Sequence, residues 1–111
     1  MMRVVNDVKK LMEIVYESDV VLVVISKTGV PETRALQRTL KKIEEKSRGL
    51  VMTVMFASEE IENDTVTVSL FFKGVEIVRQ NGIFGNEKKD YEALKWTISS
   101  VLSRKGIETP F

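Results

Sequence analysis

The chain of 111 residues contains no cysteine and no histidine. Without cysteine it forms no disulfide, carries no thiol nucleophile and offers no thiolate to a metal. Without histidine it lacks the side chain most used for acid–base catalysis and for metal binding at neutral pH. We therefore expect no metal centre and no cofactor. Catalysis would depend on Asp, Glu, Lys, Ser or Tyr, so the composition favours a binding protein over an enzyme.

The chain also lacks a long apolar run and a strong charge of either sign. No apolar stretch reaches the roughly 18 residues that a membrane span needs. The first residues do not follow the charged, apolar and small-residue order of a signal peptide. The formal net charge of +1 gives no general attraction to nucleic acid or to anionic membranes. We therefore expect a cytoplasmic protein without membrane contacts.

The rest of the composition, with 43% hydrophobic and 30% charged residues, is ordinary for a globular protein. The length suits one domain with its own core. We predict a single domain over residues 1–111, with flexible ends at residues 1–5 and 104–111.

Apolar spacing predicts two helices and a buried strand in the first half of the chain. The first helix is expected from Asn6, its N-cap, to about Ser18. Its apolar residues at helical spacing are Val8, Leu11, Met12 and Val15. The run from Val20 to Ile25 is apolar throughout and rich in β-branched residues, which is typical of a central strand covered on both faces. A second helix is expected from about Pro31 to Ser47, and its inner stripe consists of Leu36, Leu40 and Ile43.

The second half predicts three strands and a closing helix. The strands are expected at Leu50–Ala57, Thr65–Phe72 and Val75–Gln80, and Lys73-Gly74 forms a tight turn between the last two. Asn86 is placed to cap the final helix. The apolar residues of that helix are Tyr91, Leu94, Ile98, Val101 and Leu102.

These elements combine into an α/β domain with a mixed sheet. The first two strands, joined by a helix, should run parallel, and the last two should run antiparallel. The connection Ser58–Asp64 is too short for a crossover helix, so the third strand should run antiparallel to the second. We predict a three-layer domain in which helices flank a mixed four-stranded sheet.

Two segments resemble the thioredoxin-like fold superfamily. Val20–Glu45, VVLVVISKTGVPETRALQRTLKKIEE, resembles the strand, WCGPC-type motif and helix of thioredoxins. VTVSLFFKGVEIV resembles their later hairpin, and the resemblance extends from about Val20 to Leu102. It places Val30 and Thr33 at the two cysteine positions, Thr67 at the cis-proline position and Val24 at the buried acidic position. The resemblance therefore implies a thioredoxin-like fold without the CxxC motif and without thiol–disulfide exchange.

The resemblance also implies a surface. In this superfamily the end of the sheet that carries the motif receives extended polypeptides. Here that end should combine the loop from Lys27 to Val30, the strand edge at Thr67 and the loop Gly82–Gly85. We predict that a protein partner binds there, with candidate contact residues Lys27, Thr28, Val30 and Thr67.

Trp96 should lie opposite the apolar stripe of the last helix. A large aromatic away from the core face is a frequent anchor at protein interfaces, so we predict self-association or partner docking through Trp96. The alternative is packing against the tail, at Ile107 or Phe111.

Our leading hypothesis is a non-catalytic binding or scaffolding module that recognises a protein partner, with a homodimer as one form. A nucleic-acid-associated protein is the alternative, because one helix face carries Arg34, Arg38, Lys41 and Lys42. Glu44 and Glu45 interrupt this face, and no aromatic residue interleaves with it for stacking on bases. A small enzyme without thiol chemistry is the second alternative. The acidic loop SEEIENDT lacks the ligand spacing of a calcium site, so a solvated loop is favoured there.

Overall fold

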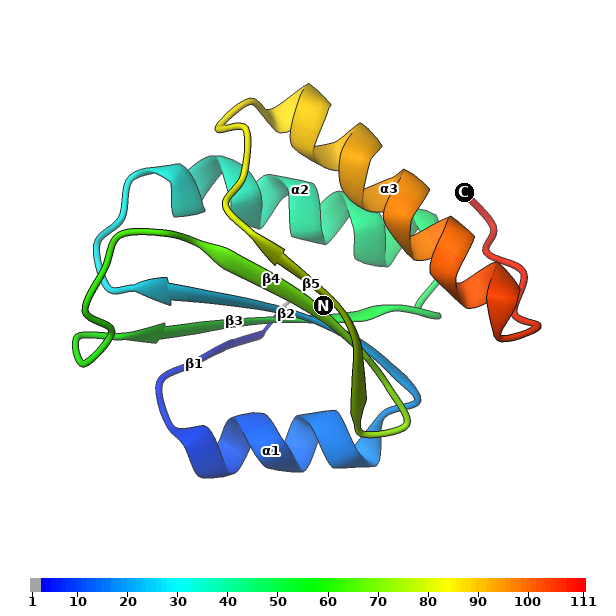
Figure 1. The fold of residues 1–111 in the computed structure, drawn as a ribbon, viewed down its shortest axis with the longest axis horizontal. Coiled ribbons are helices and arrows are strands. Elements are labelled where there is room, and N and C mark those ends of the chain that lie inside the picture. Colours follow the sequence, from blue (N-terminus) through cyan, green and yellow to red (C-terminus); the bar gives the residue numbers. More distant parts are fainter. Residues whose placement is uncertain (1–2) are drawn as a thin grey trace.

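The computed structural model describes residues 3–111, with every side chain except that of Glu32. Within this range one sheet is flanked by helices on both faces (Figure 1). The elements are β1 (Arg3–Val5), α1 (Val8–Glu17), β2 (Val20–Lys27), α2 (Glu32–Lys46), β3 (Met52–Ser58), β4 (Thr67–Phe72), β5 (Val75–Asn81) and α3 (Glu87–Arg104). Helix α1 covers one face, and α2 and α3 cover the other, which confirms the predicted three-layer α/β architecture.

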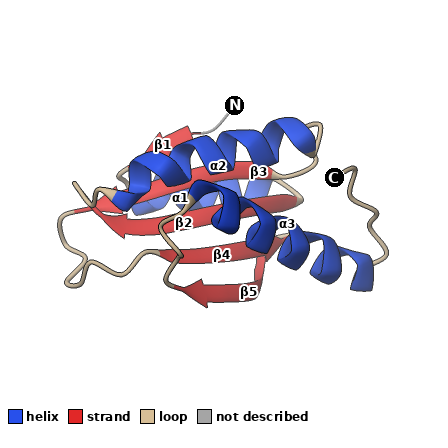
Figure 2. Cartoon of the chain, turned by 90° about the horizontal axis from the view of Figure 1, so that it is seen from above, coloured by secondary structure: helices blue, strands red, loops and turns tan. Residues whose placement is uncertain are grey.

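The sheet has the strand order β1-β3-β2-β4-β5 (Figure 2). Strand β2 is central and runs parallel to β3 and antiparallel to β4, as the sequence predicts. The chain passes from β3 to β4 across the intervening β2. The predicted count of four strands is wrong, because β1 adds a fifth strand parallel to β3. Its three residues are too few for a readable pattern, and its middle residue Val4 is 60% exposed at the sheet edge.

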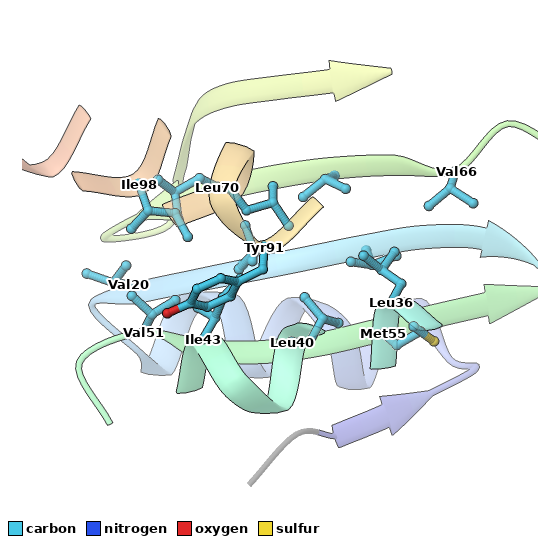
Figure 3. Close-up of a cluster of buried hydrophobic side chains, with 14 of the residues drawn as sticks. Val20, Leu36, Leu40, Ile43, Val51, Met55, Val66, Leu70, Tyr91 and Ile98 are labelled. Carbon is cyan, nitrogen blue, oxygen red and sulfur yellow. The ribbon is translucent and has the colours of Figure 1, made fainter. Parts of the chain in front are cut away.

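Two hydrophobic clusters fill the layers on either side of β2. Leu22 and Val24 point into the first cluster, whereas Val21 and Val23 point into the second, which explains why this strand is apolar throughout. The first cluster lies under α2 and α3 and contains the predicted inner residues of both helices, with Val101 at its margin (Figure 3). Those residues are Leu36, Leu40, Ile43, Tyr91, Leu94, Ile98 and Leu102.

The orientation of α1 differs from the prediction. Asp7 caps the helix instead of Asn6, because its carboxylate accepts a hydrogen bond from the backbone N–H of Lys9 at 2.9 Å. Val8 and Met12 were expected in the core but are 60% and 38% exposed. The buried residues are Leu11, Ile14 and Val15. Apolar residues cover more than half of this helix, so their spacing alone fits more than one inward face.

Both ends of the described chain contact the domain. β1 pairs with β3, and beyond α3 the side chains of Ile107 and Phe111 pack against the first cluster. The hydroxyl of Thr109 donates a hydrogen bond to that of Ser99 at 3.0 Å. These contacts lie where the sequence predicts flexible ends. The mobility of these ends stays a prediction, and Met1 and Met2 lie outside the described residues.

The predicted tight turn joins β4 to β5. Lys73 and Gly74 have φ angles of 49° and 82°, which is the left-handed pair that a two-residue hairpin loop needs. A Cβ atom on Gly74 would also lie 2.9 Å from Cδ1 of Tyr16 on α1. The positive φ angle therefore favours glycine here, and a larger side chain would also have to displace the exposed ring of Tyr16.

A β-bulge interrupts the pairing of β5 with β4. Leu70 faces Val78 and Phe71 faces Glu76, so Ile77 has no opposing residue on β4. Residues that face each other across two strands share a side of the sheet. The bulge therefore turns Glu76 to the α1 side, while Ile77 and Val78 pack on the other side against the first cluster.

The bulge brings Glu76 and Arg79 to the same side of the sheet. Without the extra residue, two positions three apart on a strand would point to opposite sides. Here the guanidinium group of Arg79 donates to both carboxylate oxygens of Glu76, at 3.1 to 3.3 Å. This ion pair joins the residues on either side of the β-bulge.

The ion pair between Glu76 and Arg79 leads to a prediction about the titration of the Glu76 carboxyl. The hydrogen bond from Arg79 lowers the pKa of the Glu76 carboxyl below its ordinary value, and slight burial opposes this. A lowered folded-state pKa stabilises the fold above the unfolded-state pKa, and this stability is lost as the pH falls through the folded value. In Arg79→Ala we expect the pKa of Glu76 to rise toward its ordinary value. Carboxyl NMR titration measures this, and an unchanged pKa contradicts the assignment.

Candidate functional site at the loop end of the sheet

Three loops meet at one end of the sheet, at the left of Figure 1. They comprise residues 28–31, 59–66 and 82–86, and we call this surface the loop end. The strand register brings them together, because Ile25 of β2 faces Thr67 of β4, which faces Asn81 of β5. Backbone hydrogen bonds tie the loops to neighbouring strands and to each other: Thr28 N–H to the Ser58 carbonyl at 3.3 Å and Gly82 N–H to the Val66 carbonyl at 2.7 Å.

The first depression at the loop end has a volume of about 280 Å³ and is lined by Lys27 to Pro31 and by Asp64. Thr28 is exposed and Lys27 is half-buried, so both of these predicted contact residues reach the surface. Val30 was predicted as a contact residue, but it is only 7% exposed and packs into the first cluster. Its side chain therefore anchors the loop to the core, and a contact of Val30 with a partner stays a prediction.

Thr67, the remaining predicted contact residue of the loop end, is half-buried at the start of β4. Its hydroxyl donates a hydrogen bond to the side-chain oxygen of Asn81 at 3.4 Å. This contact connects the β4 edge to the end of β5, and all peptide bonds among the described residues are trans. The register therefore places Thr67 between the ends of β2 and β5, opposite Ile25 and Asn81.

The start of α2 carries none of the groups that redox chemistry requires. The Thr33 hydroxyl donates to the Val30 carbonyl at 2.7 Å, so it completes the first turn of the helix. Val24, beneath this turn on β2, is fully buried and apolar. Ser26, two residues further along β2, has a hydroxyl without a hydrogen-bond partner among the described residues. With no sulfur of cysteine in the chain, thiol–disulfide exchange has no reactive atom here.

The second depression has a volume of about 410 Å³ and is lined by Gln80 to Phe84 and by Ala93 of α3. Phe84 is 66% exposed, although it is a large aromatic residue. Its backbone N–H donates to the Asp90 carboxylate at 2.8 Å, and Asp90 itself is only 3% exposed. A buried carboxylate in the first turn of α3 therefore fixes the loop that presents Phe84.

Sequence reasoning missed both Phe84 and Asp90. The available signal was the pair Ile83-Phe84 between two glycines, since an apolar pair in a short loop is unusual unless it is buried or binds something. The burial of Asp90 could not be predicted from the sequence, because a charged residue in the first turn of a helix normally faces solvent.

Trp96 is 71% exposed on α3, which contradicts the alternative in which the tail covers it. The tail residues Ile107 and Phe111 pack against the first cluster instead. Trp96 lies one helical turn beyond Ala93, on α3 and outside the loop end. It remains a predicted contact residue, separate from the loops.

The four basic residues of α2 are not buried, as predicted. Arg34, Arg38 and Lys41 line a depression of about 410 Å³ with Gln37. Two of the four cations already have partners within the chain. Arg38 contacts the Glu87 carboxylate at 3.1 Å, and the Lys42 ammonium lies 4.1 Å from the centre of the Tyr91 ring. These contacts reduce the charge that this face offers to a phosphate backbone.

The described residues contain no group of three Asp, Glu, His or Cys side chains arranged to hold a metal ion. Within residues 3–111 no helix has the length and apolar character to cross a membrane.

The fold is that of thioredoxins. Oxidised thioredoxin from Plasmodium falciparum superposes with a TM-score of 0.68 at 7% sequence identity, over 87% of this chain and 98% of that protein. A mutant thioredoxin from Halobacterium salinarum gives 0.67 at 18% identity, over 89% of this chain and 88% of that one. A mutant thioredoxin from Entamoeba histolytica gives 0.66 at 16% identity, over 90% and 99%. This chain therefore has a thioredoxin-like fold that lacks the CxxC motif.

No protein-family model and no curated protein sequence matches the chain. The structural similarity stands at low sequence identity, so it shows the fold alone.

Proposed function

We propose that this chain is a non-catalytic protein-binding module and that the loop end is its binding surface. The observation that carries the proposal is the combination of an exposed Phe84 with a buried Asp90 that fixes its backbone. An exposed aromatic on a rigid support is the usual form of a binding anchor, because little conformational freedom is lost when a partner covers it.

The surroundings of Phe84 suit a polypeptide partner. Two depressions lie at the loop end, and their linings combine apolar side chains with loop backbone and polar groups. Lys27 and Asp64 lie at one depression, whereas Ile83 and Ala93 lie at the other. A mixed surface of this kind is typical of transient protein interfaces, in which an apolar centre is surrounded by polar groups.

Phe84→Asp is expected to weaken partner binding by about thirtyfold or more, the effect typical of an interface anchor. The immobilised wild-type chain would be used to capture proteins from an extract of its native organism, and affinities for the recovered partner would then be measured. Tyr16→Asp is the matched control, since Tyr16 is a 67% exposed aromatic on α1 and lies beside the β4–β5 turn at Gly74, at the opposite end of the sheet. Equal binding by wild type and Phe84→Asp contradicts the proposed surface.

The exposed basic face of α2 makes nucleic-acid binding the second candidate. Phosphate-driven affinity falls steeply as salt rises, whereas binding at an apolar anchor changes little. The variant Arg34→Glu/Lys41→Glu separates the two, because it reverses the cations of this face other than Arg38 and Lys42. If this variant abolishes binding and Phe84→Asp does not, the second candidate replaces the first.

A further inference from the structure

The outer edge of β5 is the longest unpaired strand edge in the part of the chain that the structure describes. β5 has seven residues, Val75–Asn81, and pairs only with β4, whereas the other edge strand, β1, has three residues (Figure 2). An unpaired edge presents backbone N–H and C=O groups that can bond to another strand. This edge is therefore available for strand pairing, and its bulge determines which strand fits.

We propose that two copies of this chain pair antiparallel through their β5 edges, with Glu76 of each copy opposite Arg79 of the other. The pair would join two five-stranded sheets into one continuous sheet. This surface is separate from the loop end, and the inference does not depend on the proposed partner binding.

The bulge selects this register. Residues opposed across an antiparallel pair must lie on the same side of the sheet. Glu76 and Arg79 both lie on the α1 side, and Ile77 and Val78 both pack on the opposite side. If the two-fold axis of the dimer passes between Ile77 and Val78, each residue of β5 therefore lies opposite a residue on the same side of the sheet. An axis through either residue would set Glu76 against a residue of the other side.

Charge favours the same register. In this register the carboxylate of Glu76 lies opposite the guanidinium of the second copy's Arg79. The two-fold symmetry repeats this contact. The ion pair within each chain, at 3.1 Å, lies on the same side of the sheet, so the four charges alternate in one cluster. Opposite charges across neighbouring strands stabilise the pairing, and like charges there oppose it.

A second copy fits this edge better than an unrelated strand. A bulge normally hinders pairing at an edge, because a regular strand cannot follow its extra residue. A second copy supplies the matching bulge at the matching position, together with the complementary charges. The edge is therefore selective for this chain itself.

Charge-reversal variants test the register by sedimentation velocity from micromolar to millimolar concentration. Wild type is expected to show a concentration-dependent dimer. Glu76→Arg and Arg79→Glu should each weaken the dimer about tenfold or more, since each places like charges in opposition. An equal mixture of the two variants should recover a dimer, because one chain then carries two cations and the other two anions. No pairing within a chain can produce that recovery.

Glu59→Arg is the control for charge reversal, since Glu59 is exposed in the loop between β3 and β4. Circular dichroism would establish that each variant is folded, and the neutral variants Glu76→Gln and Arg79→Gln replace any reversal that unfolds the chain. A wild type that stays monomeric at millimolar concentration overturns the proposal. It is equally overturned by single variants that dimerise as wild type does, or by a mixture that recovers nothing.

Discussion

Leu40→Ala is expected to lower the free energy of unfolding by about 2–5 kcal/mol, the range for leucine truncation in a packed core. Leu40 is fully buried between α2 and the sheet (Figure 3). It lies in the cluster that joins α2, α3 and the central strands, so the cavity would open where side chains from all of these elements meet. Chemical denaturation followed by circular dichroism measures the loss.

Met12→Ala is the matched control for this prediction. The sequence places Met12 and Leu40 equally on the inner faces of their helices, but Met12 is 38% exposed and Leu40 is not exposed at all. We expect Met12→Ala to change the stability by less than about 0.5 kcal/mol, as for ordinary surface positions, because alanine also favours the helix. Equal losses for the two variants would contradict the observed orientation of α1.

Asp90→Ala is expected to destabilise the fold by about 1.5–3 kcal/mol. The substitution removes a charged acceptor and leaves the Phe84 N–H without its partner, and hydrogen bonds to charged groups have about this magnitude. Asp90 also lies in the first turn of α3, where a negative charge interacts favourably with the helix dipole. Thermal and denaturant unfolding would measure the loss.

Two further observations distinguish this role from simple packing. Asp90→Asn keeps an acceptor oxygen in place, so we expect it to cost less than Asp90→Ala. The amide of Phe84 should exchange with solvent faster in Asp90→Ala than in wild type, because its hydrogen bond is lost. If the Phe84 amide exchanges at the same rate in all three proteins, Asp90 does not fix this loop.

Much of the fold could be predicted because the strongest sequence signals were unambiguous. The apolar run of β2 and the long stripes of α2 and α3 each allow one buried arrangement. The pattern of α1 allowed more than one, so Met12 was placed wrongly. β1 gave no signal at all, since three partly exposed residues carry no period.

The candidate site was predictable only where strand ends define it. The expected meeting of the Lys27–Val30 loop with Thr67 follows from the positions of β2 and β4 in the sheet. Phe84 and Asp90 escaped prediction because their roles depend on one hydrogen bond between a loop and a helix. The bulge at Ile77 escaped for a related reason: residue patterns at edge strands do not specify strand register.

A thioredoxin-like fold without thiol chemistry is physically consistent. The Val30 side chain, at the start of α2, packs against the core, and Val24 lies beneath it in the same cluster. Both residues contribute apolar burial where a redox site would need ionisable groups. The end of the sheet is thus well anchored, which is what a rigid binding surface requires.

Site-specific photo-crosslinking in the native organism tests the central claim most directly. A photoreactive phenylalanine analogue would replace Phe84 in one strain and Tyr16 in another, and adducts would be resolved by mass and identified. We expect a discrete protein adduct from position 84 that is absent from position 16. No protein adduct at position 84, or the same adducts from both positions, would contradict protein binding at the loop end.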